Sequence, residues 1–221
     1  MLTSVERILS AALGAGQWNS VSTPLLSAYP AAALRVGREP LALSARELRE
    51  LNAVAPDIGF ERWMREDAAR ALLLIAHRAT GRAGDAFVAD ALECFEQGDA
   101  REQQSWLRAI ALWPEAAAFL PHAVDACRTN IIPVFEALAC ENPYPSQHFP
   151  DRNFNQVVLK AMFNSIALQR IVGLPSRLNA ELSRMARDYA AERTAAGRSV
   201  PPDINLALSP SAEAAVDQQE P

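Results

Sequence analysis

A polar segment between two apolar stretches holds the residues with the clearest capacity for chemistry. It has the sequence NPYPSQHFPDRNFNQVVLK and spans residues 142–160. Its three prolines restrict the backbone, which predicts a rigid, non-helical linker ahead of a helix. Because a rigid linker can hold polar groups in fixed positions, this segment is our candidate ligand-binding site. Its candidate ligand-binding residues are Asn142, Tyr144, His148, Asn155 and Lys160.

Two of these residues could do chemistry rather than only bind. His148 titrates near neutrality and could serve as a general base. Lys160 is the single lysine of the chain, and it could contact a carbonyl or phosphate group or, if desolvated, act as a nucleophile. Structural roles are the alternative and the commoner case: a histidine that braces the loop and a solvated lysine on a helix face.

Asn155 falls on the apolar side of the helix expected after Asp151, its predicted N-cap. An amide at a core-facing position costs free energy unless it is hydrogen-bonded. It must therefore either brace its own loop or meet a ligand. The brace is the favoured interpretation, since buried polar groups are usually satisfied within the protein.

A second group of charged residues predicts a structural clamp. Helical projection places Asp67 on a face that should be buried, and a buried carboxylate needs a cation. Arg70 or Arg128 could supply a bidentate partner. Glu136 could join this network or face the segment 142–160. We predict a structural network here rather than a catalytic acid.

The common catalytic and cofactor motifs are missing from the sequence. There is no P-loop, no GxGxxG after a strand, no HExxH, no GxSxG and no DxDxDG. We therefore predict no catalytic residue and no cofactor. Cys94, Cys127 and Cys140 form no CxxC pair and are expected to be reduced thiols. The two later cysteines, with His122 and His148, match no usual zinc spacing, so we predict no metal.

The elements that must position these residues are predicted to be helical. The 221 residues include only 9 glycines and few β-branched runs, while Ala, Leu, Arg and Glu dominate, so the fold class should be all-α. Short Gly or Pro turns favour antiparallel helix pairs, stacked as a HEAT-like helical array or an irregular bundle. The predicted helices span residues 3–14, 44–54, 59–79, 84–97, 100–112, 115–129, 131–141, 151–172 and 176–196.

Capping signals set the ends of these helices. Capping boxes predict helix starts at Thr3 with Glu6, Ser44 with Glu47, and Asp99 with Glu102. Left-handed glycines predict helix stops at Gly81, Gly98, Gly173 and Gly197.

We expect one helical domain over residues 1–198. Residues 199–221 include four prolines and predict an extended strap that ends in a disordered tail, with Ile204, Leu206 and Leu208 available to dock on the domain.

No apolar run is long enough for a transmembrane helix, and Glu6 and Arg7 do not fit a secretory signal, so we expect a cytoplasmic protein without direct membrane insertion. The net charge of -5 argues against nucleic acid as a partner.

Several short motifs are together specific for one family. They are Arg62-Trp63, Asp67-Ala68-Ala69-Arg70, Gly98-Asp99, Ala126-Cys127-Arg128-Thr129-Asn130, Asn142-Pro143-Tyr144-Pro145, His148-Phe149, Phe154-Asn155-Gln156 with Lys160, Asp188-Tyr189-Ala190, Glu192-Arg193 and Gly197-Arg198. With these motifs the chain resembles the EboA family, encoded in the Ebo gene cluster of various bacteria and some algae. The resemblance covers about residues 43–204.

The resemblance implies a pathway more than a reaction. Ebo clusters also encode proteins that resemble a membrane prenyltransferase and several hydrolase-, cyclase- and isomerase-like enzymes, and in some cyanobacteria the cluster is linked to export of a sunscreen precursor. The implied partners are other Ebo-cluster proteins and a small-molecule metabolite. No catalytic residue is carried over from the family.

Three functions fit the sequence. The leading hypothesis is a non-catalytic helical scaffold or metabolite-binding accessory protein that serves synthesis or export of a secondary metabolite. The second is an enzyme that acts on a small polar or prenylated intermediate, with its site around residues 142–160. The third is a purely structural protein, in which the polar segment only locks helix packing.

Overall fold

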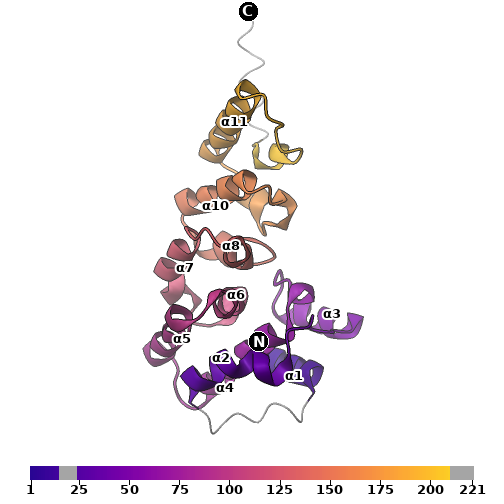
Figure 1. Ribbon diagram of the computed structural model, residues 1–221, viewed down its shortest axis with the longest axis vertical. Coiled ribbons are helices and arrows are strands. Elements are labelled where there is room, and N and C mark those ends of the chain that lie inside the picture. The colour runs from indigo at the N-terminus through magenta and orange to yellow at the C-terminus, as the bar shows by residue number, and fades with distance from the viewer. Residues whose placement is uncertain (15–23, 210–221) are drawn as a thin grey trace, which may run out of the picture. The chain divides into compact units, whose positions relative to one another are not determined.

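The computed structural model describes residues 1–14 and 24–209 (Figure 1). Within these residues the chain forms eleven α-helices and six short 3₁₀ helices and no strand, apart from an isolated bridge between Pro40 and Met64. The predicted all-α class is confirmed, while the HEAT-like array or irregular bundle stays a prediction. The chain divides into two compact units, Met1–Leu138 and Ala139–Pro221. No helix in the described ranges combines the length and apolar character needed to cross a membrane.

Unit 1 contains most of the helices. They are α1 (Leu2–Leu13), α2 (Leu25–Val36), α3 (Ala45–Val54), η1 (Phe60–Arg62), α4 (Arg65–Ala79), α5 (Asp85–Gln97), α6 (Ala100–Ala109), η2 (Ile110–Leu112), η3 (Ala116–Phe119) and α7 (Leu120–Ala126), while α8 (Ile132–Ala139) ends at the boundary. Unit 2 contains α9 (Tyr144–His148), α10 (Asp151–Phe163), η4 (Leu168–Arg170), η5 (Leu174–Arg177), α11 (Ala180–Ala195) and η6 (Ile204–Ala207).

Helix α4 is the centre of unit 1. Every residue from Glu66 to Ile75 is buried, and the helix contacts α1, α2 and α6. A helix with only one apolar side would leave its polar side in water. Helix α4 can be buried on all sides because small or aliphatic residues occur around its whole circumference. Its few polar side chains must therefore find their partners inside the protein.

Helix α2 is absent from the sequence prediction. Pro30 lies in its interior, where a proline normally opposes a helix. Pro30 is exposed, while Ala28, Tyr29 and Ala32 are buried on the side of α2 that contacts α4 and α5. Burial on that side outweighs the local cost of the proline. The predicted helix 59–79 is also interrupted, because Trp63 is extended between η1 and α4.

Two of the three predicted capping boxes are present. Ser44 pairs with Glu47 and Asp99 pairs with Glu102, each with both reciprocal hydrogen bonds. The predicted start at Thr3 is wrong, because the N-cap of α1 is Met1 and no side chain caps the helix.

Helices end at three of the four glycines that we predicted as stops, Gly81, Gly98 and Gly197. Gly173 is left-handed with φ 75°, but it precedes η5 and ends no helix of the predicted range, since α10 already ends at Phe163. Gly81 and Gly197 are left-handed just after α4 and α11, with φ of 92° and 65°. Gly98 is not left-handed, since its φ is -71°. A Cβ at Gly98 would lie 2.8 Å from the carbonyl oxygen of Cys94, so close packing rather than φ requires the glycine.

The linker predicted within residues 142–150 is partly helical. Pro143 and Pro145 stand at the N-cap and in the first turn of α9, where a missing N–H costs nothing, so the short helix forms despite them. The helix predicted over 151–172 ends early, at Phe163. The predicted N-cap Asp151 is instead the first helical residue, after Pro150.

The end of α10 is set by a Schellman motif. Ser165 is left-handed with φ 57°, and its N–H donates to the carbonyl of Met162 at 3.1 Å. The N–H of Ile166 donates to the carbonyl of Ala161 at 2.9 Å. The backbone therefore leaves the helix although the apolar pattern continues. Ile166 is buried in the turn after α10, and Leu168 is buried at the start of η4.

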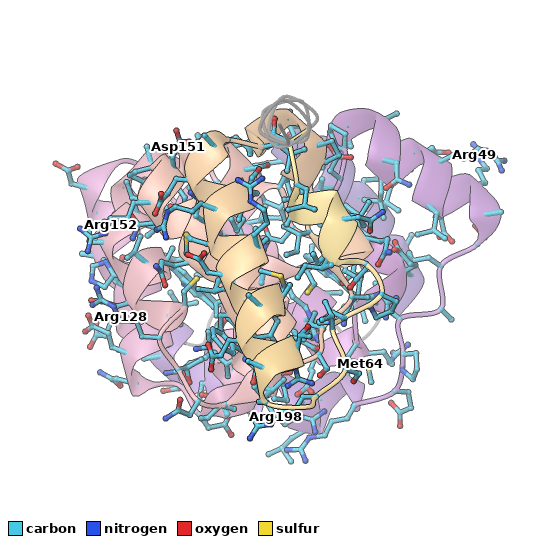
Figure 2. All side chains as sticks on the ribbon, turned by 90° about the horizontal axis from the view of Figure 1, so that it is seen from above. Arg49, Met64, Arg128, Asp151, Arg152 and Arg198 are labelled. Atoms are coloured by element: carbon cyan, nitrogen blue, oxygen red, sulfur yellow. The ribbon has the colours of Figure 1, made fainter. Side chains whose placement is uncertain are left out.

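The segment after α11 docks on unit 2 as a strap, which we define as residues 199–209. Figure 2 shows Arg198 at the C-terminal end of α11, where the chain turns back along the helix. Ala207 in η6 is fully buried, and the hydroxyl of Ser183 accepts a hydrogen bond from the N–H of Ser209 at 2.8 Å. Leu206, predicted to dock, is 37% exposed. The predicted disordered tail lies outside the described residues from 210 onward.

All three cysteines are thiols, as predicted. Cys94 and Cys140 are buried, and burial raises the pKa of the Cys94 thiol to about 12. Among the described residues no group of three or more His, Cys, Asp and Glu is placed to hold a metal ion.

Candidate functional site

The first two residues of the predicted site are buried in unit 2. Asn142 is 2% exposed, and its side-chain oxygen accepts a hydrogen bond from the N–H of Tyr144 at 3.0 Å. This contact forms the turn that starts α9. The Tyr144 side chain is fully buried, which raises the pKa of its phenol well above the usual range. Both residues thus help to fix the local backbone.

His148 packs on Tyr144 at the end of α9. The two ring centroids are 4.5 Å apart, and burial lowers the pKa of His148 below its usual value. The neutral imidazole is therefore the form that the folded protein favours. It contacts an aromatic ring, as a bracing histidine would.

We expect this contact to make stability sensitive to acid. Because the pKa of His148 is lower in the folded state than its unfolded value near 6.5, the unfolded chain takes up the proton first as the pH falls. The stability that His148 contributes is therefore complete above that value and declines below it. Urea unfolding from pH 7.5 to 5 should show a smaller decline for His148→Gln than for the wild type. An equal decline in both proteins would contradict the expectation.

Asn155 is held by a reciprocal amide pair with Asn179. Asn155 is 2% exposed, its Nδ2 donates to Asn179 Oδ1 at 3.1 Å, and Asn179 Nδ2 donates to Asn155 Oδ1 at 3.0 Å. Asn179 is also the N-cap of α11 and accepts a hydrogen bond from the N–H of Leu182 at 2.8 Å. Asn155 therefore braces α10 against the start of α11, whereas the brace that we expected was to its own loop.

Lys160 lies on the C-terminal half of α10 and is half-buried. Its backbone carbonyl accepts a hydrogen bond from the Asn164 side chain at 2.8 Å. Unit 2 also has a pocket between α10, α11 and the strap, and none of the five predicted ligand-binding residues lines it.

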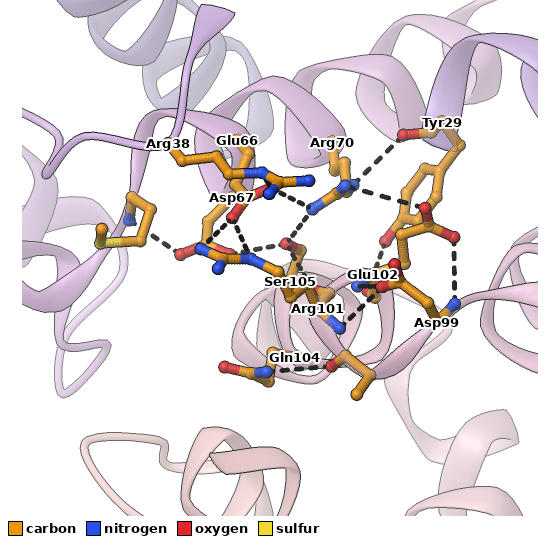
Figure 3. Close-up of polar contacts among 12 residues, drawn as sticks. Tyr29, Arg38, Glu66, Asp67, Arg70, Asp99, Arg101, Glu102, Gln104 and Ser105 are labelled. Atoms are coloured by element: carbon orange, nitrogen blue, oxygen red, sulfur yellow. Dashed lines mark hydrogen bonds and ion pairs between the residues drawn. The ribbon is translucent and has the colours of Figure 1, made fainter. Parts of the chain in front are cut away.

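Asp67 lies in a network of hydrogen bonds between α4 and α6 (Figure 3). The cation that its carboxylate contacts is Arg108, rather than Arg70 or Arg128. Asp67 Oδ2 accepts hydrogen bonds from Arg108 Nη1 at 2.6 Å and from the N–H of Met64 at 2.8 Å. Asp67 Oδ1 accepts one from the hydroxyl of Ser105 at 2.6 Å. The carboxylate joins the first turn of α4 to α6, as a clamp should.

Arg70 belongs to the same network through Ser105 and Glu66. Its Nη1 donates to the Ser105 hydroxyl at 2.9 Å and to Glu66 Oε2 at 3.2 Å, while its Nε donates to the carbonyl of Tyr29 at 3.2 Å. Glu66 also accepts from Arg101 Nε at 2.9 Å. Figure 3 shows these side chains between α4, α6 and the carbonyl of Tyr29. The cluster thus satisfies the polar groups that α4 buries.

The other two predicted members lie outside this cluster. Arg128 pairs with Asp125 at 2.6 Å within one exposed turn, so it does not reach Asp67. Glu136 is half-buried on α8.

Unit 2 contains a pocket of about 370 Å³ that the sequence did not indicate. Three segments surround it: the end of α10 with the turn into η4, the C-terminal half of α11, and the start of the strap. Its lining residues are Met162, Ser165, Ile166, Ala167, Gln169, Tyr189, Arg193, Ser199, Val200, Pro201, Pro202 and Asp203. A volume of this size suits a small organic molecule.

Arg193 and Asp203 supply the charged groups of the pocket. Arg193 Nε donates to the carbonyl of Ser199 at 2.9 Å, and its guanidinium lies 5.9 Å from the ring centroid of Tyr189. Asp203 Oδ2 accepts a hydrogen bond from the N–H of Leu168 at 2.7 Å. Both side chains therefore fasten the strap, which forms one wall of the pocket.

The pocket lining combines apolar and polar residues. Met162, Ile166 and Val200 contribute aliphatic or thioether surface, and Tyr189 contributes its ring, since its hydroxyl donates to the carbonyl of Met162 at 3.3 Å. Such a lining can bind a partly apolar molecule and orient it through Arg193. The spacing of Tyr189 and Arg193, four residues apart on one helix, was the signal that could have placed both on one face.

An all-α protein with an amphipathic, ligand-sized pocket is the class that these features define. A family model described as "Metabolite traffic protein EboA" matches residues 16–208. The chain therefore belongs to the EboA family, as the sequence motifs predicted. Neither the curated proteins nor the solved structures contain a match to the chain.

Proposed function

We propose that this protein is a non-catalytic accessory protein that binds a small-molecule metabolite during its synthesis or export. The observation that carries the proposal is the pocket between α10, α11 and the strap, with its apolar side chains and the cation of Arg193. The description of the family, metabolite traffic protein, fits this function. The proposed ligand-binding site is thus the pocket, rather than the segment 142–160 that the sequence indicated.

Binding fits the pocket better than catalysis. Its reactive groups already hold the fold: Tyr189 donates to a backbone carbonyl, while Arg193 and Asp203 fasten the strap. Of the residues suggested for an enzyme, Tyr144 is buried and Asn155 is paired with Asn179. A group that is committed to structure is a poor general acid or base, since it must exchange protons with a substrate.

Filling the pocket should abolish binding and leave the fold intact. Ala167 is exposed, lines the pocket and has an extended backbone, so Ala167→Trp would place an indole in the opening. The matched control is Ala191→Trp, at an exposed position of α11 outside the lining. The measurement is the thermal midpoint with and without the small-molecule fraction of cells that express the pathway.

A ligand that binds only the folded state raises the midpoint by mass action. We expect a rise for the wild type and for Ala191→Trp, and none for Ala167→Trp. An equal rise for Ala167→Trp would place binding elsewhere, and no rise for the folded wild type would refute metabolite binding.

A further inference from the structure

We propose that the ligand of this pocket is an amphipathic monoacid, a molecule with an apolar body and one carboxylate or phosphate group that binds Arg193. This inference rests on the proposed function, because it names the class of ligand for the same pocket.

The guanidinium of Arg193 is pre-organised to bind an acid group. Its Nε donates a hydrogen bond to the carbonyl of Ser199, and its Cζ lies over the ring of Tyr189. No described residue accepts a hydrogen bond from its two Nη atoms, so these donors are available to a ligand. A planar guanidinium matches the two oxygens of a carboxylate or phosphate. Because the side chain is already held in place, binding costs little further conformational entropy.

The remaining lining combines the uncharged polar residues Ser165, Gln169 and Ser199 with apolar residues that favour an apolar body. Met162, Ile166, Val200 and Pro201 offer no charged group to a ligand. At roughly 30 Å³ for each water-sized group, a pocket of about 370 Å³ accommodates on the order of a dozen non-hydrogen atoms. A ten-carbon chain with a carboxylate has this size.

Asp203 restricts the ligand to a single acid group. Its Oδ2 is held by the N–H of Leu168, while no described residue donates to its Oδ1. A carboxylate that lines the pocket repels a second anionic group on the ligand. The acid must therefore face Arg193, and a diacid of the same length should bind more weakly than a monoacid.

Simple probes test this inference on the full chain. Isothermal titration with decanoate and decyl phosphate compares the two acid types, and 1-decanol is the uncharged reference. Arg193→Gln removes the cation, and Arg187→Gln makes the same charge change at an exposed position of α11 outside the pocket. Asp203→Asn keeps an oxygen for Leu168 and removes the repulsive charge.

We expect at least one acid to bind the wild type more tightly than 1-decanol. Arg193→Gln should weaken acid binding about 10- to 100-fold, as expected for a lost charge-assisted hydrogen bond. It should weaken 1-decanol binding much less, because the alcohol loses only the support that Arg193 gives to the strap. Arg187→Gln should bind like the wild type. Asp203→Asn should strengthen acid binding about two- to fivefold, which tests the class of ligand even if Arg193→Gln does not fold. The acid that binds more tightly identifies the type of head group.

The outcomes separate the ligand class from the site. If 1-decanol binds as tightly as both acids and Ala167→Trp blocks its binding, the ligand needs no acid group. The inference about the ligand class then fails, while the pocket is still the binding site. If Arg193→Gln and Arg187→Gln weaken acid binding equally, Arg193 is not the anchor and the inference fails. If no probe binds and the metabolite fraction leaves the thermal midpoint unchanged, the proposed function fails as well.

Discussion

Replacing Asp67 with alanine is expected to lower the free energy of unfolding of unit 1 by about 3–5 kcal/mol, because it breaks a buried ion pair from one side. Asp67 is 1% exposed and accepts three hydrogen bonds, from Arg108, Ser105 and the N–H of Met64. Alanine leaves the Met64 N–H without its acceptor and Arg108 without its carboxylate. Arg108 is only 25% exposed, so water replaces little of what it loses.

Tryptophan fluorescence in a urea titration measures this effect selectively. All four tryptophans of the chain lie at or before residue 113, so the signal reports on unit 1. The matched control is Asp125→Ala. Asp125 pairs with Arg128 at the same distance of 2.6 Å, but both side chains are at least 70% exposed, and such pairs contribute about 0–1 kcal/mol. Losses of equal size for Asp67→Ala and Asp125→Ala would show that burial adds nothing to the pair.

The contrast between Asp67 and its partner shows what helical periodicity can predict. A helical projection depends only on residues a few positions apart, and it correctly placed Asp67 on a buried face. The cation, Arg108, is 41 residues away in sequence on α6, and helical periodicity does not distinguish it from the other arginines. Arg128 was a reasonable candidate by type, but it lies in an exposed turn. The partner of a buried charge depends on which helices pack together, and short-range sequence patterns do not predict that packing.

The same distinction explains the errors in secondary structure. Local capping chemistry gave the starts of α3 and α6, where side chain and backbone pair within one turn. It did not give α2, because burial against α4 and α5 outweighs the cost of Pro30. The apolar pattern also continued past the end of α10, because Ile166 is buried outside a helix. An apolar pattern indicates which residues are buried. It does not distinguish a buried turn from a helix.

The pocket could not be found from a motif because no single segment contains it. Its walls come from the turn after α10, from α11 and from the strap. The polar segment 142–160 attracted attention through its composition, but its amides and rings are used to fix α9 and to join α10 with α11. The many polar residues of this segment therefore indicated hydrogen bonds that hold the backbone and the helices in place. The pocket arises where the strap returns to the helices.

Replacing Asn179 with alanine is expected to lower the free energy of unfolding of unit 2 by about 2–4 kcal/mol, the sum of two losses. Removal of the N-cap of α11 costs about 1 kcal/mol. The buried amide of Asn155 loses its partner, which costs about 1–3 kcal/mol more. Asn179→Ser separates the two, because serine still caps the helix but does not reach Asn155, so only the second loss should remain.

Amide hydrogen exchange read by mass spectrometry over α10 and α11 measures these losses directly. In Asn155→Leu/Asn179→Ser both side-chain amides of the pair are removed, so no buried amide is left without a partner and the double variant should be more stable than Asn179→Ser alone. Equal stability of Asn179→Ser and the wild type would contradict the brace. The double variant also bears on function, since Asn155 does not line the pocket. If Asn155 is a brace and not a ligand contact, the double variant must keep the thermal shift that Ala167→Trp loses.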